Sequence, residues 1–79
     1  MRVRVKLFAT LARFVPDTAP AATFDVELPA GATVAELIRH LKLPEHEVKL
    51  IFVDGRARTA DWVLQPDEQV GIFPPVGGG

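Results

Sequence analysis

The last residues of the chain are the ones whose types and spacing best suit chemistry. Positions 73 to 79 read FPPVGGG. Proline fixes φ and favours an extended backbone, so Pro74 and Pro75 should lead the chain away from its last strand. The glycines that follow have no side chains, so they should form a thin arm with an unshielded carboxylate at its end. The segment 74–79 reaches at most roughly 20 Å when extended. This pattern predicts a tethered reactive carboxylate, and a frayed glycine-rich terminus is the alternative that composition leaves open.

The rest of the sequence holds few groups that catalyse reactions. It contains no Ser, Cys, Tyr or Asn, and its only imidazoles are His40 and His46. A triad built on a Ser or Cys nucleophile is therefore excluded. A metal site would need both histidines to converge with Glu45 or Glu47 across Pro44, which is poor ligand spacing. We expect no metal and no bound cofactor, and we expect the body of the protein to carry no self-contained catalytic machinery.

Composition limits the class of protein and its partners. The chain has 79 residues, of which 48% are hydrophobic and 24% charged, as in a small globular domain. Its net charge is −1 and no cluster of Lys or Arg is denser than alternate positions, so we expect no nucleic-acid partner. No apolar run approaches the roughly 18 residues of a membrane helix, and no charged leader opens the sequence. We therefore expect a cytoplasmic protein with no membrane contact.

Hydrophobic periodicity predicts the elements that would position the tail. Apolar and polar residues alternate over 2–8, 24–28 and 69–73, which predicts three half-buried strands. Asp25 and Glu27 should face the basic outward positions of the first strand as cross-strand pairs. A capping box of Thr33 and Glu36 should open a helix with one apolar stripe, formed by Val34, Leu37, Ile38 and Leu41. Leu43 and Pro44 should end this helix. A further strand is expected over 48–53, with a turn at 54–55 and a short returning strand at 56–58.

This order of elements predicts an α+β fold of the β-grasp (ubiquitin-like) kind. One amphipathic helix can cover one face of a mixed sheet of four to five strands. By analogy to ubiquitin-like domains, we expect the first and last strands to lie parallel at the centre of this sheet. We expect a single domain over residues 1–73 and an extended tail over residues 74–79. If Leu7 and Ile72 face the helix, Phe8 and Phe73 must face away from it, near the root of the tail. The two phenylalanines then mark a docking surface for a partner.

Four segments of the sequence resemble the sulfur-carrier branch of the ubiquitin-like proteins, and most closely the small subunit of molybdopterin synthase. They read VKLFATL at 5–11, PAGATVAEL at 29–37, VDGR at 53–56 and PDEQVGIFPPV at 66–76. The resemblance covers essentially the whole chain, and the ending FPPV-x-GG is its most specific part. The chain departs from the family at Ala12 and Arg13, where the family often has Arg and Glu, and at Gly77, where a residue with a side chain is usual.

The resemblance implies a mechanism in which Gly79 carries sulfur. A ubiquitin-activating-like adenylyltransferase would join the Gly79 carboxylate to AMP from ATP, and a sulfur donor protein would convert it into a thiocarboxylate. The tail would then enter the large subunit of molybdopterin synthase, which holds the active site, and give its sulfur to a cyclic pyranopterin phosphate. The chain itself would be a non-catalytic subunit in molybdenum cofactor biosynthesis. The residues expected to bind partners are Phe8, Phe73, Pro74, Pro75, Val76, Gly77 and Gly78.

Two other functions fit the same tail. A sulfur carrier for thiamine thiazole synthesis shares the fold and the tail chemistry, but it usually lacks the FPPV segment. A ubiquitin-like protein modifier would join its terminal glycine to lysines through isopeptide bonds. The sequence does not separate a molybdenum pathway from a tungsten pathway, because both use the same pterin chemistry.

Overall fold

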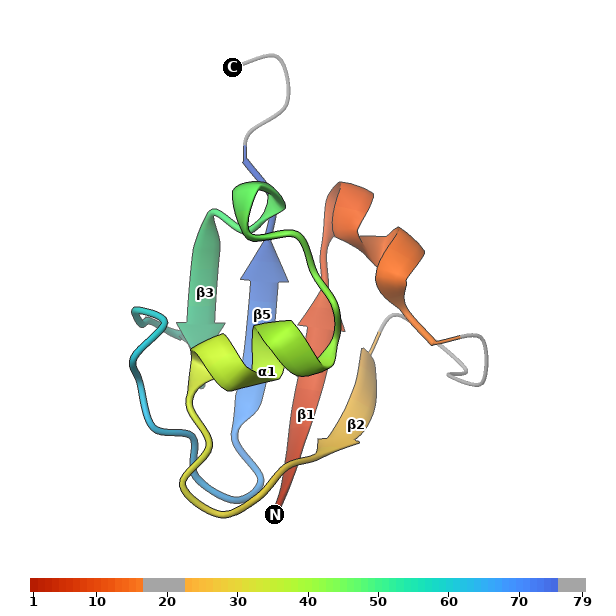
Figure 1. The fold of residues 1–79 in the computed structure, drawn as a ribbon. Coiled ribbons are helices and arrows are strands. Elements are labelled where there is room, and N and C mark those ends of the chain that lie inside the picture. Colours follow the sequence, from red (N-terminus) through yellow and green to blue (C-terminus); the bar gives the residue numbers. More distant parts are fainter. Residues whose placement is uncertain (17–22, 76–79) are drawn as a thin grey trace.

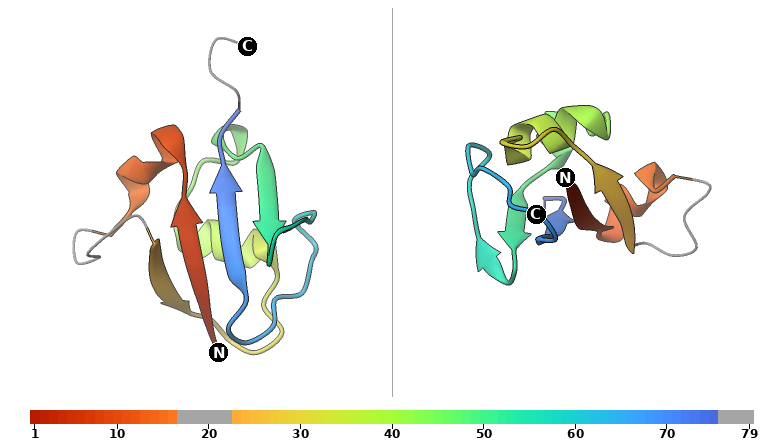
Figure 2. Two further views of the ribbon diagram at one scale, coloured as in Figure 1. Left: turned by 180° about the vertical axis from the view of Figure 1, so that it is seen from behind. Right: turned by 90° about the horizontal axis from the view of Figure 1, so that it is seen from below.

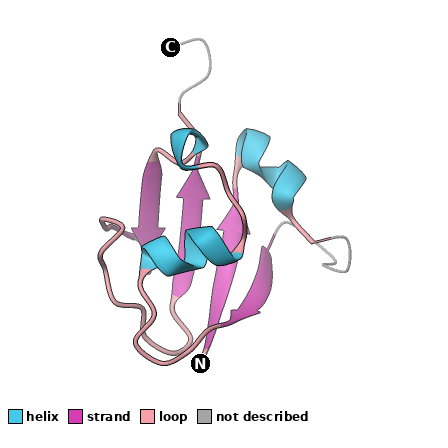
Figure 3. Ribbon diagram, viewed as in Figure 1, coloured by secondary structure: helices cyan, strands magenta, loops and turns pink. Residues whose placement is uncertain are grey.

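A computed structural model describes residues 1–16 and 23–75. The predicted α+β architecture is confirmed, with one α-helix packed on one face of a mixed sheet (Figures 1 and 3). The elements are β1 (Arg2–Leu7), η1 (Ala9–Phe14), β2 (Thr23–Glu27), α1 (Val34–His40), η2 (Glu45–Glu47), β3 (Leu50–Val53), β4 (Arg56–Ala57) and β5 (Gln69–Phe73).

The sheet has five strands in the order β2-β1-β5-β3-β4. β1 and β5 lie side by side and parallel at its centre, and every other neighbouring pair is antiparallel. This is the β-grasp arrangement predicted from the sequence. The parallel pair places the end of β1 beside the end of β5, with Leu7 as the register partner of Ile72.

The pairing of β1 with β2 follows charge as well as hydrophobicity. Arg2 lies opposite Glu27 and Arg4 lies opposite Asp25, as the alternating sequence predicts. The Nε atom of Arg4 donates to Oδ1 of Asp25 at 3.2 Å. The inward residues of the same strand, Val3 and Val5, are fully buried.

The predicted capping box opens α1. The backbone N–H of Glu36 donates to Oγ1 of Thr33 at 3.3 Å, and the backbone N–H of Thr33 donates to Oε1 of Glu36 at 3.4 Å. Val34, Leu37 and Ile38 are buried, and Leu41 packs against the same core while staying half-buried. The helix therefore presents its apolar stripe to the sheet, as expected.

The helix ends earlier than the sequence suggested, at His40 rather than at Leu43 and Pro44. Lys42 adopts a left-handed conformation with φ 58°, and its N–H donates to the carbonyl of Arg39 at 3.0 Å. The N–H of Leu43 donates to the carbonyl of Ile38 at 3.1 Å. These two bonds form a Schellman motif, which closes the helix with Lys42 where glycine is usual.

Two strands are shorter than expected. β3 begins at Leu50 rather than Val48, because Glu45–Glu47 forms a 3-10 turn that Val48 closes. β4 holds only Arg56 and Ala57. The turn that joins β3 to β4 has left-handed φ values at Asp54 (50°) and Gly55 (83°), which is the geometry of a two-residue hairpin loop.

One apolar core lies between α1 and the inner face of the sheet. Leu11 of η1 is fully buried in it, so η1 closes the end of the core beside β1. The opposite face of the sheet has no helix over β1, β5 and β3 in the described part of the chain, as the view from behind shows (Figure 2). No helix in residues 1–16 or 23–75 has the length and apolar character needed to cross a membrane.

Candidate docking surface and root of the tail

The tail begins at the centre of the sheet. β5 ends at Phe73 between β1 and β3, where the N–H of Phe8 donates to the carbonyl of Ile72 at 3.1 Å. On the other side, the N–H of Lys49 donates to the carbonyl of Phe73 at 2.8 Å. Pro74 is half-buried and Pro75 is exposed. The chain therefore leaves the domain from a point that is held by hydrogen bonds on both sides.

The remaining tail residues of the sequence prediction, Val76, Gly77, Gly78 and Gly79, lie outside the described residues. Their role and the division of the chain at residue 73 remain predictions. What the structure shows is the surface from which the tail departs.

Three phenylalanines form an aromatic cluster on the face of the sheet opposite α1. The rings of Phe8 and Phe73 are stacked, with centroids 4.0 Å apart and planes 9° apart. The ring of Phe52 meets Phe73 edge to face, at 5.5 Å and 80°. All three side chains are half-buried. Aromatic surface of this kind, left partly open on a sheet, is suited to binding a protein partner.

The sequence predicted the positions of Phe8 and Phe73, and the structure brings them together. The sequence did not single out Phe52 or Leu50, which both lie on the outer face of β3. Leu50 is the register partner of Phe73 and is 47% exposed. The available signal was the alternation in LIFV, where Ile51 and Val53 are buried and their neighbours are not.

Cationic side chains border the aromatic cluster. Nζ of Lys6 lies 4.9 Å from the centroid of the Phe8 ring, which is a cation–π distance. Arg4 lies further along the same face of β1 and pairs with Asp25. A hollow of about 390 Å³ opens between these cations and the three rings.

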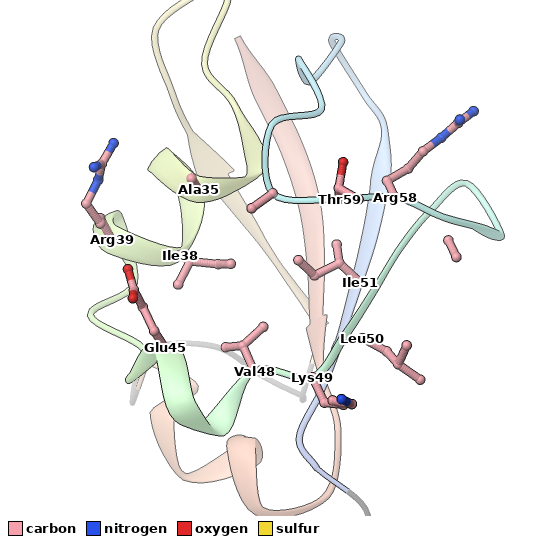
Figure 4. Close-up of a pocket in the computed structure, with 12 residues that line it drawn as sticks. Ala35, Ile38, Arg39, Glu45, Val48, Lys49, Leu50, Ile51, Arg58 and Thr59 are labelled. Carbon is pink, nitrogen blue, oxygen red and sulfur yellow. The ribbon is translucent and has the colours of Figure 1, made fainter.

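A second, larger hollow of about 640 Å³ lies between α1 and the edge of β3. Its floor includes Ile38 and Ile51, and its rim carries charges of both signs, such as Glu45 and Lys49 (Figure 4). The described residues contain no group of three or more His, Asp or Glu side chains that could hold a metal.

Comparisons with known proteins support the ubiquitin-like fold. A family model described as Mut7-C ubiquitin matches residues 1–77. The structure titled putative molybdopterin converting factor, subunit 1, from Pyrococcus furiosus is 32% identical in sequence. The match covers 95% of this chain and 98% of that chain, with a TM-score of 0.75. No curated protein sequence matches the chain.

More distant structures share the fold. Small archaeal modifier protein 1 from Haloferax volcanii is 23% identical, with 95% of this chain and 98% of that chain covered and a TM-score of 0.73. Subunit 1 in the complex of subunits 1 and 2 of molybdopterin-converting factor from Helicobacter pylori is 20% identical. That match covers 100% of both chains, with a TM-score of 0.64. At these identities the likeness supports the ubiquitin-like fold alone.

Proposed function

The chain belongs to the Mut7-C ubiquitin family, and from this premise we propose that it is a sulfur carrier whose Gly79 carboxylate becomes a thiocarboxylate. The recipient of the sulfur is a cyclic pyranopterin phosphate, and the chain acts as the small subunit of a molybdopterin synthase. One observation carries the proposal. A domain similar to a molybdopterin converting factor subunit 1 ends its central strand at Phe73, beside the aromatic cluster, and runs on into the proline–glycine tail.

The chemistry requires activation, because a carboxylate has no usable leaving group. An adenylyltransferase of the ubiquitin-activating type transfers AMP from ATP to the Gly79 carboxylate and releases pyrophosphate. The terminal sulfur of a persulfide on a donor protein attacks the acyl carbon, and AMP leaves. A thiol then reduces the resulting acyl disulfide, which releases the thiocarboxylate and leaves a disulfide between the donor and that thiol. ATP is consumed by the activating enzyme, and this chain binds no cofactor.

Some residues of the chain bind the partner, and others deliver the sulfur. The aromatic cluster, which includes Phe73, binds the large subunit. Pro74 and Pro75 limit the conformational entropy that the tail loses on insertion. Val76, Gly77 and Gly78 form the narrow segment that enters the active site of the large subunit. The domain itself provides a fixed origin for the tail, because hydrogen bonds hold the end of β5 on both sides.

The same tail supports two other acceptors. A protein modifier would use the Gly79 adenylate to form an isopeptide bond with a lysine, and the fold shared with small archaeal modifier protein 1 favours keeping this candidate. A thiamine thiazole carrier would deliver the same thiocarboxylate to another enzyme. The FPPV segment favours the molybdopterin acceptor over the thiamine acceptor.

Reconstitution tests the proposal. The purified chain is incubated with an adenylyltransferase of the ubiquitin-activating type, ATP, a persulfide donor and a thiol, and the C-terminal peptide is analysed by mass spectrometry. We expect an acyl-adenylate without the sulfur donor and a thiocarboxylate with it. A chain that forms neither product, or that appears only as conjugates to lysine, would contradict the sulfur-carrier assignment.

A further inference from the structure

Gly71 lies at the centre of the outer face of the sheet, beneath the aromatic cluster. Its register partners are Lys6 on β1 and Phe52 on β3, so the side chains on either side of it are a cation and an aromatic ring. A Cβ atom built at Gly71 would lie 3.2 Å from Cε2 of Phe8 and 3.5 Å from Cε1 of Phe73. The first distance is shorter than an ordinary carbon contact.

The backbone conformation at position 71 does not require a glycine. The glycines with positive φ in the described residues are Gly31 and Gly55, and Gly71 is not among them. Its conformation is one that any residue adopts in a strand. Gly71 therefore differs from the turn glycines, because its missing side chain lets the rings of Phe8 and Phe73 lie close against β5.

The hollow of about 390 Å³ is lined by Gly71 and by the rings that lie against it, and the charged residues in its described lining have one sign. Apolar walls come from the three phenylalanines and the floor includes Gly71, while the charged lining residues are Arg4 and Lys6. No carboxylate of residues 1–16 or 23–75 lines it, although the chain as a whole has a net charge of −1. Arg4 pairs with Asp25, whereas Lys6 makes no ion pair within residues 1–16 and 23–75.

We infer that a partner protein inserts one apolar side chain into the hollow over Gly71 and places a carboxylate against Lys6. The apolar side chain gains contact with the faces and edges of the aromatic cluster, which is the arrangement of a buried hot spot. The carboxylate gains a cation that the described part of the chain leaves without an anionic partner. Gly71 is then a specificity-determining residue, since a methyl group there would press against the Phe8 ring and shift a wall of the hollow.

This inference rests on the proposed function for the identity of the partner, the large subunit of molybdopterin synthase. The test measures the dissociation constant of the purified large subunit for the full chain by calorimetry, at two salt concentrations. The variants are Gly71→Ala and Lys6→Glu. Lys42→Glu is the matched control, because it makes the same change of charge at the exposed end of α1.

We expect Gly71→Ala to weaken binding by about tenfold or more, because the methyl group shifts the Phe8 ring that forms a wall of the hot-spot hollow. Lys6→Glu should weaken binding to a similar degree, about tenfold, and should flatten or reverse the salt dependence, which a purely structural role would not do. Lys42→Glu should bind within about twofold of the unmodified chain, because dissolved salt screens the interaction between an exposed charge and a distant interface. Thermal unfolding of each variant separates a loss of binding from a loss of folding.

The outcomes separate the inference from the function on which it rests. Unchanged binding by folded Gly71→Ala and Lys6→Glu overturns the inference and leaves the sulfur carrier intact. A chain that forms the thiocarboxylate but does not bind the large subunit overturns both the inference and the molybdopterin acceptor. A chain that binds with the expected pattern but never carries sulfur supports the inference and contradicts the proposed function.

Discussion

The rings of Phe8 and Phe73 lie parallel with their centroids 4.0 Å apart, although one follows the first strand and the other ends the last. The parallel pairing of β1 with β5 brings them together, since the residues before them, Leu7 and Ile72, are register partners in the buried face. The topology of the β-grasp sheet therefore builds an aromatic surface at the point where the tail leaves. Under the proposed function, the partner would dock beside the point from which the tail delivers its sulfur.

Replacing Phe73 with Ala should weaken binding of the large subunit by about tenfold or more, because its ring contacts both Phe8 and Phe52. The same change should lower the free energy of unfolding by about 1–3 kcal/mol through lost aromatic contacts. Val63→Ala is the control, since Val63 is an exposed apolar residue (46%) outside the cluster. Calorimetric binding together with denaturant unfolding measures both effects. Equal binding by the two folded variants would remove the aromatic cluster from the interface.

Deleting Gly78 and Gly79 should abolish thiocarboxylate formation and leave the domain as stable as before. The two residues lie beyond the described core and β5, and the reaction as proposed uses the Gly79 carboxylate. Mass spectrometry after reconstitution measures the first effect, and the midpoint of thermal unfolding measures the second. Activity that survives the deletion would indicate a binding module whose glycines are incidental.

The sequence predicted some residues of the aromatic cluster and not others, because local strand geometry positions some of them and pairing between strands positions the rest. The alternation around Leu7 and Ile72 was sufficient to place Phe8 and Phe73 on the outer face, because side-chain direction in a strand is a local property. The contribution of Phe52 was not predicted, because it depends on the register that sets Phe52 opposite Gly71, and tertiary pairing fixes that register.

The ends of elements were predicted less well than their existence, for a related reason. The helix stops at His40 because Lys42 takes a left-handed conformation, and no glycine marks that position in the sequence. β3 starts two residues late because Val48 closes a 3-10 turn. In both places a short hydrogen-bonded turn overrides a hydrophobic pattern that would have continued.

Lys42→Gly should stabilise the domain by up to about 1 kcal/mol, because glycine adopts the left-handed conformation without the steric cost that a Cβ atom brings. Lys42→Ala is the matched control, because it removes the charge and keeps the Cβ atom. Chemical denaturation of the three proteins gives the comparison. A gain for Ala equal to that for Gly would show that charge, and not backbone conformation, limits stability at this turn.

Thr33→Ala should lower the free energy of unfolding by about 1 kcal/mol, the usual cost of losing an N-cap hydroxyl. For a domain of this size that corresponds to a fall of about 4–8 °C in the unfolding midpoint. Thr33→Ser keeps the oxygen that accepts from the N–H of Glu36 and should retain most of the stability. Since Thr33 lies on the helix side of the sheet, binding of the large subunit should not change. A variant that keeps its full stability would show that the capping box contributes little.

The most direct test of the central claim is the intact mass of the chain purified natively from a cell that makes molybdenum cofactor, with the modified peptide mapped. The account predicts a species heavier by one exchange of oxygen for sulfur, roughly 16 Da, located on the free α-carboxyl group of Gly79. The same spectrum shows whether Gly79 ends in a free α-carboxyl group. A chain that shows only the unmodified mass after activating enzyme, ATP and sulfur donor are supplied, or only isopeptide links to lysine, would contradict the account.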